Sequence, residues 1–335
     1  MANLRTESSP KPELPEPSLL ARYTCASILM GIFAIWGKYT FVNEAELQVG
    51  EDLHDYKVPL GFTVFYLVSL PLMREMVDRF AIVDMKLLLK ESMILYNAAQ
   101  VALNAWMVYK MVDAVLFRGH PFVGSITAPL EAGASYAVWV HYCDKYLEFI
   151  DTYFMVLRGK MDQVSFLHVY HHFTISWAWW IGVWLWPHGD CYFGALLNSL
   201  IHVMMYSYYT LSLLRVSCPW KKYLTMAQLT QFTTVVIYSV VSFCSLPEES
   251  TWRHVVGLGT QVFEMTSLFV MFMHFYRKSY NKGKKASLPK APEKLVNIEK
   301  TESTSSTGSS ESSPRASETS DTGSEQSESD SEQSD

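Results

Sequence analysis

The feature that most constrains this chain is a series of long apolar windows. The hydrocarbon core of a bilayer is about 30 Å thick, and a helix crosses it with roughly 20 residues. Windows near that length occur at residues 59–74, 92–113, 133–156, 164–186, 191–213, 226–246 and 256–276. Since 49% of all residues are hydrophobic and only 18% are charged, the pattern predicts an all-α integral membrane protein with seven transmembrane helices.

The two ends of the chain differ from this central part. We treat residues 1–56 as an N-terminal extension, 57–280 as the membrane domain, and 281–335 as a tail that is first basic and then rich in Ser and acidic residues. The composition of the tail predicts disorder. Within the extension, residues 21–42 are apolar. That segment could span the membrane, lie in its interface or pack against the bundle, and the sequence leaves these alternatives open.

Basic residues indicate how the bundle is oriented, because Lys and Arg accumulate in short cytosolic loops. They follow the first, third, fifth and seventh windows: Arg74, Arg79, Lys86 and Lys90; Arg158 and Lys160; Arg215, Lys221 and Lys222; and Arg277, Lys278, Lys282, Lys284 and Lys285. The intervening loops hold only Arg118 and Arg253 as strongly basic residues. The C-terminus is therefore expected in the cytosol.

Four of the windows carry polar side chains at helical spacing, which places each set largely on one face of its helix. The third window holds His141, Lys145, Glu148 and Thr152, with Asp151 beside them. The fourth holds His168, His171 and His172. The fifth holds Asn198, His202, Tyr206 and Tyr209. The sixth holds Thr225, Gln228 and Gln231.

The expected topology brings these sets to a similar depth. Successive windows alternate in direction, so His171 would lie about 10 Å inside the fourth helix and His202 about 15 Å inside the fifth. Ionisable side chains at membrane depth are costly and usually functional. We therefore expect one polar pocket that opens to the cytosol.

Structural and metal-binding interpretations compete with this one. Lys145 and Glu148 could form a purely structural ion pair. The side chains of Asn198, Thr225, Gln228 and Gln231 could simply form hydrogen bonds between helices. The tyrosines of the fifth window could belong to an aromatic belt at the membrane interface. The HxxHH spacing also occurs in membrane di-iron enzymes, which need about eight histidines in several boxes. This chain has ten histidines but only one such box, and we expect no metal.

The polar sets form four ordered motifs. KYLEFIDT fits KxxExxDT, HVYHH fits HxxHH, NSLIHVMMYSYY fits NxxxHxxMYxYY, and TMAQLTQ fits TxxQxxQ. With these motifs, the chain from about residue 57 to 280 resembles the ELO family of very-long-chain fatty acid elongases, the 3-oxoacyl-CoA synthases of the endoplasmic reticulum membrane. One motif alone would be weak, but four in order are specific.

The resemblance implies a closed bundle of seven transmembrane helices around an acyl tunnel, with the CoA end cytosolic. It implies condensation of acyl-CoA with malonyl-CoA to 3-oxoacyl-CoA, CoA and carbon dioxide, without a metal or another cofactor. The reductases and dehydratase of the elongation cycle are expected partners, a homodimer stays open, and nucleic acid is not expected. HVYHH preceded by Gln163, together with MYSYY, looks more like elongases of polyunsaturated chains than of saturated or monounsaturated ones.

The chemistry suggests roles for the motif residues. We hypothesise that His171 attacks the thioester, that His202 polarises the reacting carbonyl or the malonyl carboxylate, and that His168 and His172 orient the pair. Asp151 would fix a histidine tautomer and Lys145 would hold an anionic group. The expected substrate-binding set comprises Lys145, Glu148, Thr152, Asn198, Tyr206, Tyr209, Gln228 and Gln231.

Two alternatives remain open. In the first, the same histidines act only as general bases in a direct condensation, without an acyl-enzyme. In the second, the protein is a lipid transporter or lipid-binding membrane protein, for which a polar pocket between helices would serve equally well.

Overall fold

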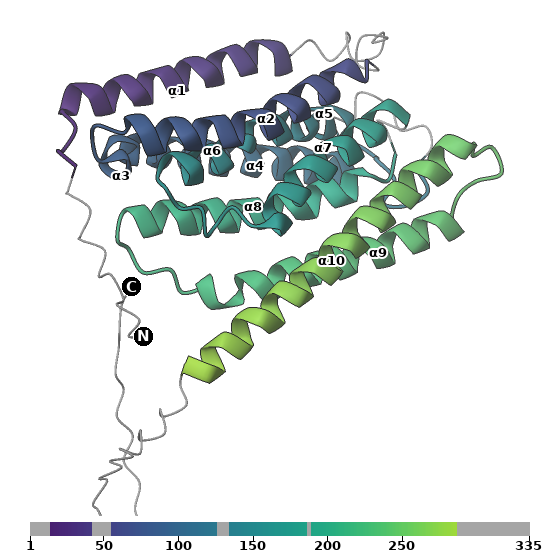
Figure 1. The fold of residues 1–335 in the computed structure, drawn as a ribbon. Helices are drawn as coiled ribbons and strands as arrows, with labels where there is room; N and C mark the ends of the chain where they lie inside the picture. The colour runs from purple at the N-terminus through teal and green to yellow at the C-terminus, as the bar shows by residue number, and fades with distance from the viewer. Residues whose placement is uncertain (1–13, 42–54, 126–133, 186–188, 287–335) are drawn as a thin grey trace, which may run out of the picture. The chain divides into compact units, whose positions relative to one another are not determined.

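The described part of the structure consists of helices and the turns between them (Figure 1). The computed structural model describes residues 14–41, 55–125, 134–185 and 189–286, which all belong to one compact unit, Met1–Ser287. The helices are α1 (Leu19–Thr40), α2 (Lys57–Phe80), α3 (Met85–Leu88), α4 (Lys90–Phe117), α5 (Ala134–Leu147), α6 (Phe149–Leu157), α7 (Phe166–Leu185), α8 (Tyr192–Leu213), the 3-10 turn η4 (Lys221–Tyr223), α9 (Leu224–Cys244) and α10 (Trp252–Ala286).

The long helices pack around α5 and the facing parts of α4, α7 and α8. α4 packs against α8, α5 and α1, while α7 packs against α5 and α10. α9 packs against both α8 and α10. α2 packs against α6 and α7. Eleven of the 14 residues of α5 are buried. The third window, with most of the charged motif residues, therefore provides the centre of the bundle.

Four described helical segments are long and apolar enough to cross a membrane: Leu19–Thr40, Lys57–Phe80, Lys221–Cys244 and Trp252–Arg277. Their surfaces fit that setting, since large apolar side chains such as Phe65 on α2 and Phe263 on α10 are each 65% exposed. This confirms a multi-pass membrane protein. It also shows that residues 21–40 of the apolar segment 21–42 lie in the 22-residue helix α1, which packs against α4, while residue 42 lies outside the described residues.

The other predicted windows correspond to α4, to α5 with α6, to α7 and to α8. α5 and α6 have 14 and 9 residues and are each shorter than a span, and all of these helices bury polar side chains. The count of seven spans therefore stays a prediction. The basic residues at 282–285 and the tail beyond residue 286 lie outside the described side chains.

The prediction of one continuous helix over residues 133–156 is wrong in one detail. The segment breaks into α5 and α6 at Glu148, where the amide of Asp151 donates to the carbonyl of Glu148, three residues back, at 3.1 Å. A bond over three residues tightens the chain locally relative to an α-helical turn. The break thus occurs inside the KxxExxDT motif.

Asp190 ties three segments together where α7 connects to α8. Its buried carboxylate accepts from the amides of Gly124 at 2.8 Å and Ser125 at 2.9 Å, and from the hydroxyl of Ser242 on α9. Gly124 has φ +78°, and a Cβ there would lie 3.0 Å from the carbonyl oxygen of Ser245. Burial raises the pKa of the Asp190 carboxyl, while the two amides act in the opposite direction.

Replacing Asp190 by alanine is expected to destabilise this end of the bundle. The two amides and the Ser242 hydroxyl would lose their acceptor, at a cost of about 3 kcal/mol in total. Thermal unfolding of the purified protein in detergent measures the effect. Ser242→Ala, which removes one donor and leaves the carboxylate two others, should lower the melting temperature much less, and equal shifts would contradict this account of the Asp190 contacts.

Candidate active site

A buried ion pair lies at the break between α5 and α6. The ammonium nitrogen of Lys145 lies 2.5 Å from Oε1 of Glu148, and each side chain is 1% exposed. Lys145 also donates to the side-chain oxygen of Asn198 on α8 at 3.1 Å. A buried charge needs a partner and further hydrogen bonds, and the pair has both. Three predicted site residues from two motifs are thus joined directly.

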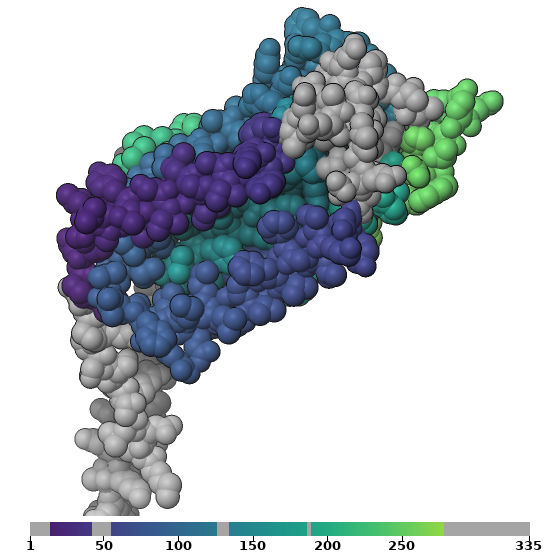
Figure 2. Space-filling model, turned by 90° about the horizontal axis from the view of Figure 1, so that it is seen from above, coloured from purple at the N-terminus to yellow at the C-terminus, as the bar shows by residue number. Residues whose placement is uncertain are grey.

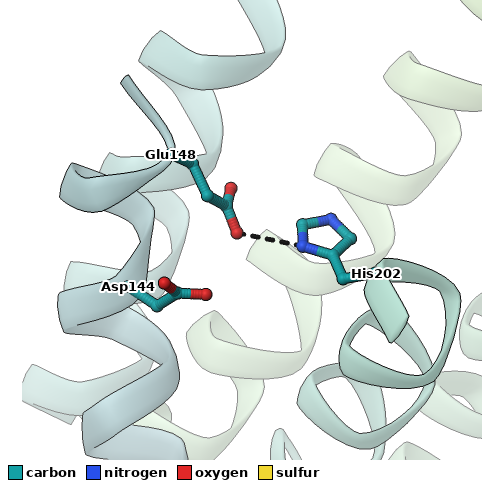
Figure 3. Close-up of side chains that lie close together, drawn as sticks. All are labelled: Asp144, Glu148 and His202. Carbon is teal, nitrogen blue, oxygen red and sulfur yellow. Dashed lines mark ion pairs between the residues drawn. The ribbon is translucent and has the colours of Figure 1, made fainter. Parts of the chain in front are cut away.

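His202 joins this group from α8. Its Nδ1 atom lies 3.0 Å from the same Glu148 oxygen, as the dashed line in Figure 3 shows. Asp144, from α5, points toward the same space (Figure 3). The carboxylate that contacts His202 is therefore that of Glu148. Glu148 is better placed than Asp151 for the orienting role that we hypothesised for Asp151.

Asp144, Glu148 and His202 could in principle hold a metal ion, because one ligand atom from each lies within 4.8 Å of the others. However, Glu148 already faces the ammonium of Lys145, and the amide of Gln100 donates to Asp144 at 3.0 Å. A cation placed there would be repelled by the Lys145 charge. The donor set therefore fits a proton-transfer or hydrogen-bonding site better than a metal centre.

The three histidines of HVYHH lie on the first turns of α7. The ring centroids of His168 and His172 are 4.5 Å apart, and those of His171 and His172 are 5.4 Å apart. Thr152 fixes the position of His168, because its hydroxyl lies 2.8 Å from Nε2 of that ring. The Thr152 hydroxyl also lies 2.9 Å from the hydroxyl of Tyr66 on α2. The predicted KxxExxDT and HxxHH motifs are thereby in contact.

Asp151 is held by tyrosines. The hydroxyl of Tyr206 donates to Oδ2 of Asp151 at 2.6 Å. The ring of Tyr96, from α4, lies edge-on to Tyr206 with centroids 5.9 Å apart. Tyr206 and Tyr96 are fully buried. This tyrosine of the NxxxHxxMYxYY motif therefore belongs to the site rather than to an interfacial aromatic belt.

The four motifs meet around one cavity of about 340 Å³. The predicted site residues that line it are Glu148, Asp151, His168, His171, His172, Asn198, His202, Tyr206, Tyr209, Thr225, Gln228 and Gln231. Lys145 and Thr152 lie behind this lining and bond to it. Gln163, noted before HVYHH, lines the same cavity. The expected convergence of the polar sets is confirmed.

His141, the remaining polar residue of the third window, has a packing role. Its Nδ1 atom lies 3.1 Å from the hydroxyl of Ser199, and its ring lies 4.6 Å from the ring of Trp179. The side chain is fully buried and is not part of the cavity lining. Its role in the described structure is thus packing, with one hydrogen bond through Nδ1 and none through Nε2.

The sequence interpretation missed several residues that support the site. Asp144, Tyr66 and Tyr96 were not singled out, although each contacts a predicted site residue or its neighbour. A signal existed on α4, where Asn97, Gln100 and Asn104 are all buried and follow a helical spacing. The rule that identified the other four sets would have identified this polar stripe in the second window.

Comparisons with known proteins agree with the motifs. Residues 53–288 match the sequence pattern of the ELO family, described as the GNS1/SUR4 family. The chain is 36% identical to very long chain fatty acid elongase 5 of Tachysurus fulvidraco over 239 residues, which cover 69% of this chain and 78% of that protein. It is 35% identical to fatty acid elongase 5 of Leishmania major over 255 residues, which cover 74% and 94%.

The chain is also similar to a relative named elongase 4 rather than elongase 5. Very long chain fatty acid elongase 4 of Homo sapiens is 35% identical over 216 residues, which cover 61% of this chain and 66% of that protein. The matched region contains all four motifs and every predicted site residue. The chain therefore belongs to the ELO (GNS1/SUR4) family and is a fatty acid elongase with condensing activity.

Proposed function

We propose that this elongase condenses a long-chain polyunsaturated acyl-CoA with malonyl-CoA, through a histidine-based site in the endoplasmic reticulum membrane. The observation that carries the proposal is the shared cavity, in which His171 of α7 and His202 of α8 lie among amide and hydroxyl groups. Acyl transfer needs a nucleophile or base and donors for a developing oxyanion, and this lining supplies both.

In the first step, a ring nitrogen of neutral His171 attacks the thioester carbonyl. The new carbon–nitrogen bond forms as the carbon–sulfur bond breaks, and CoA leaves as a thiolate that takes up the proton released from the other ring nitrogen of His171. The product is an acyl-imidazole. His168 and His172 restrict where the His171 ring can lie, since the three rings are adjacent on α7.

In the second step, malonyl-CoA loses carbon dioxide. The electron pair of the broken carbon–carbon bond attacks the acyl carbonyl carbon, and the bond to His171 breaks. The departing ring nitrogen takes up one proton from water, so that 3-oxoacyl-CoA forms and neutral His171 is restored. His202, protonated on both ring nitrogens in this step, donates from Nε2 to the thioester oxygen on which negative charge develops. The Glu148 carboxylate, with Oε1 3.0 Å from Nδ1 of His202, offsets the charge of the protonated ring and orients it.

Lys145 and Asn198 complete this half of the site. The Lys145 charge lowers the cost of negative charge in the cavity, although the ammonium itself is held by Glu148 and Asn198. Gln228 and Gln231, from α9, line the cavity, and in this scheme they bond the amide groups of the CoA arm. No metal or other cofactor takes part in this scheme.

The substrate class and the location extend the same proposal. Gln163 lines the cavity beside HVYHH, the combination that favours polyunsaturated chains. α2, α4, α5 with α6, α7, α8, α9 and α10 form the seven spans of the family region, with the end of α10 in the cytosol. The reductases and dehydratase of the elongation cycle then receive the product, and a homodimer is compatible with this arrangement.

The substrate class is tested by feeding microsomes that contain the enzyme labelled malonyl-CoA and matched saturated, monounsaturated and polyunsaturated acyl-CoAs. Formation of 3-oxoacyl-CoA should be fastest with the polyunsaturated chains, whose bends a narrow cavity discriminates. A preference for saturated or monounsaturated chains of equal length would contradict the assignment while leaving the condensing activity intact.

His171→Ala is expected to lower product formation by about 100-fold or more, because it removes the nucleophile or base. The matched control is His274→Ala, since His274 is an exposed histidine on α10. Both variants are compared at equal amounts of folded protein. Near wild-type activity of His171→Ala would exclude the proposed role.

The two-step scheme differs from direct condensation in what happens without malonyl-CoA. The purified wild-type enzyme should then release one equivalent of CoA and gain the mass of the acyl group on a peptide that contains His171. His171→Ala should show neither event. If the wild type releases no CoA until malonyl-CoA is added, the histidines act as general bases in a single condensation.

A further inference from the structure

α1 lies before the region that matches the ELO family, yet it is part of the folded body. The match begins at residue 53, while α1 ends at Thr40. Figure 2 shows α1, in purple, along the outside of the molecule, with atoms of later helices between it and α2. α1 packs against α4, α3 and α5. Its inward stripe comprises Ala26, Leu29, Phe33, Trp36 and Thr40.

Two indole groups bond α1 to α5 reciprocally. The Nε1 atom of Trp36 donates to the carbonyl oxygen of Cys143 at 3.0 Å, and that of Trp139 donates to the carbonyl oxygen of Thr40 at 2.9 Å. On each helix the tryptophan and the carbonyl are four residues, or about one turn, apart. We call these four residues the indole clasp. A buried indole N–H needs an acceptor, and here each helix supplies one to the other.

The clasp contacts the chain next to Asp144, Lys145 and Glu148, which we call the catalytic segment. Cys143 immediately precedes Asp144 and Lys145, in the last turn of α5 before the break at Glu148. A helix end beside a break lacks the support that a continuing helix would give. The bond from Trp36 therefore holds the backbone of α5 near the break from a helix that lies outside the matched family region.

A second route runs from α1 to the same break through Tyr96. The ring of Phe33 lies 5.9 Å from that of Tyr96, edge-on. The Tyr96 hydroxyl donates to the carbonyl of Leu147, the last residue of α5, at 3.3 Å. Tyr96 also packs against Tyr206, which donates to Asp151. α1 therefore supports both sides of the break, α5 directly and Asp151 of α6 through two tyrosines.

The clasp also fixes the direction of α1. Trp36 meets Cys143 while Thr40 meets Trp139, so α1 is antiparallel to α5. At its other end, Nε of Arg22 donates to Glu91 in the first turn of α4 at 2.8 Å. The starts of α1 and α4 thus lie at the same end of the bundle, which is the cytosolic end under the proposed orientation. α1 is also long and apolar enough to cross a membrane.

We propose that α1 is an eighth transmembrane helix that positions the catalytic segment, with Trp36 as its main positioning residue. It touches no reacting atom. It acts by holding the Cys143 carbonyl, and through it Asp144, Lys145 and the break at Glu148, in the arrangement that the cavity needs. The inference rests on the elongase activity and on the proposed roles of Lys145, Glu148 and His202.

The topology is tested on sealed microsomes that contain the full chain with one epitope added at the N-terminus and another at the C-terminus. Protease added outside should remove both epitopes without detergent. Protection of the N-terminal epitope, with removal of the C-terminal one, would show that α1 does not cross in the proposed direction and would overturn the eighth span.

The positioning role is tested with Trp36→Phe in the full chain, since this change keeps an aromatic ring and removes the indole donor. The kcat per folded enzyme should fall about fivefold, because small displacements of catalytic groups are costly, with little change in KM for acyl-CoA. Trp139→Phe should act in the same direction. The matched control, Trp252→Phe, alters a tryptophan that is 61% exposed and should leave kcat unchanged.

A merely structural α1 predicts a different result. Trp36→Phe would then lower the yield or the melting temperature while kcat per folded enzyme equals that of the wild type, and that outcome overturns the proposal. His171→Ala, assayed in the same series, reports on the chemistry separately. Full activity of His171→Ala would reject the proposed function, whereas full kcat of Trp36→Phe with an inactive His171→Ala would reject only the role of α1.

Discussion

The buried pair of Lys145 and Glu148 is the interaction on which the rest of the site depends. Two charges inside a membrane protein are tolerated only when each is paired and further hydrogen-bonded, and removing one partner of such a pair costs about 3–5 kcal/mol. Here the ammonium faces Glu148 and Asn198, and the carboxylate faces Lys145 and His202. These requirements fix α5 against α8, and so bring the KxxExxDT and NxxxHxxMYxYY motifs together.

The same pair coincides with the break between α5 and α6. Because the chain tightens at Glu148, the residues before and after it need not follow one helical face. Lys145 and Glu148 face α8, while Thr152 contacts His168 on α7. One short segment can therefore orient histidines from two different helices toward one cavity. The apolar outer faces of α2 and α10 remain available for lipid.

Much of this arrangement was predictable from the sequence. Apolar windows and helical spacing located the helices and the polar sets, since burial in a bilayer forces a strong pattern on a sequence. The convergence of His171, His202 and Gln228 on one cavity followed from alternating directions and from depth along each helix. These rules depend on the periodicity of a helix and on the thickness of the membrane, which vary little between proteins.

Other features could not be read from the sequence. The break at Glu148 depends on a local hydrogen bond over three residues, and no Pro or Gly marks it. The partner of Asp151 proved to be Tyr206, because rotation about the helix axis within a bundle is set by packing rather than by spacing. The contact between Trp36 and Cys143 joins residues 107 positions apart. Such pairings depend on the tertiary arrangement alone.

The same limit applies to α1. Its sequence is compatible with an interfacial helix as much as with a span. Only the contacts with Glu91, Tyr96 and Cys143 distinguish a packed helix of defined direction from an apolar segment on the surface. The elongase fold in this chain thus includes a helix that the family region does not contain.

The most direct test of the account is an experimental structure of the enzyme with a non-hydrolysable thioether analogue of an acyl-CoA. The account predicts that the carbon replacing the thioester carbonyl lies within about 3.5 Å of a ring nitrogen of His171, the distance of a reactive contact. The His202 ring should face the same carbon while still contacting Glu148. An analogue seated elsewhere in the bundle, with both histidines out of reach of that carbon, would contradict the assignment of this cavity as the condensing site.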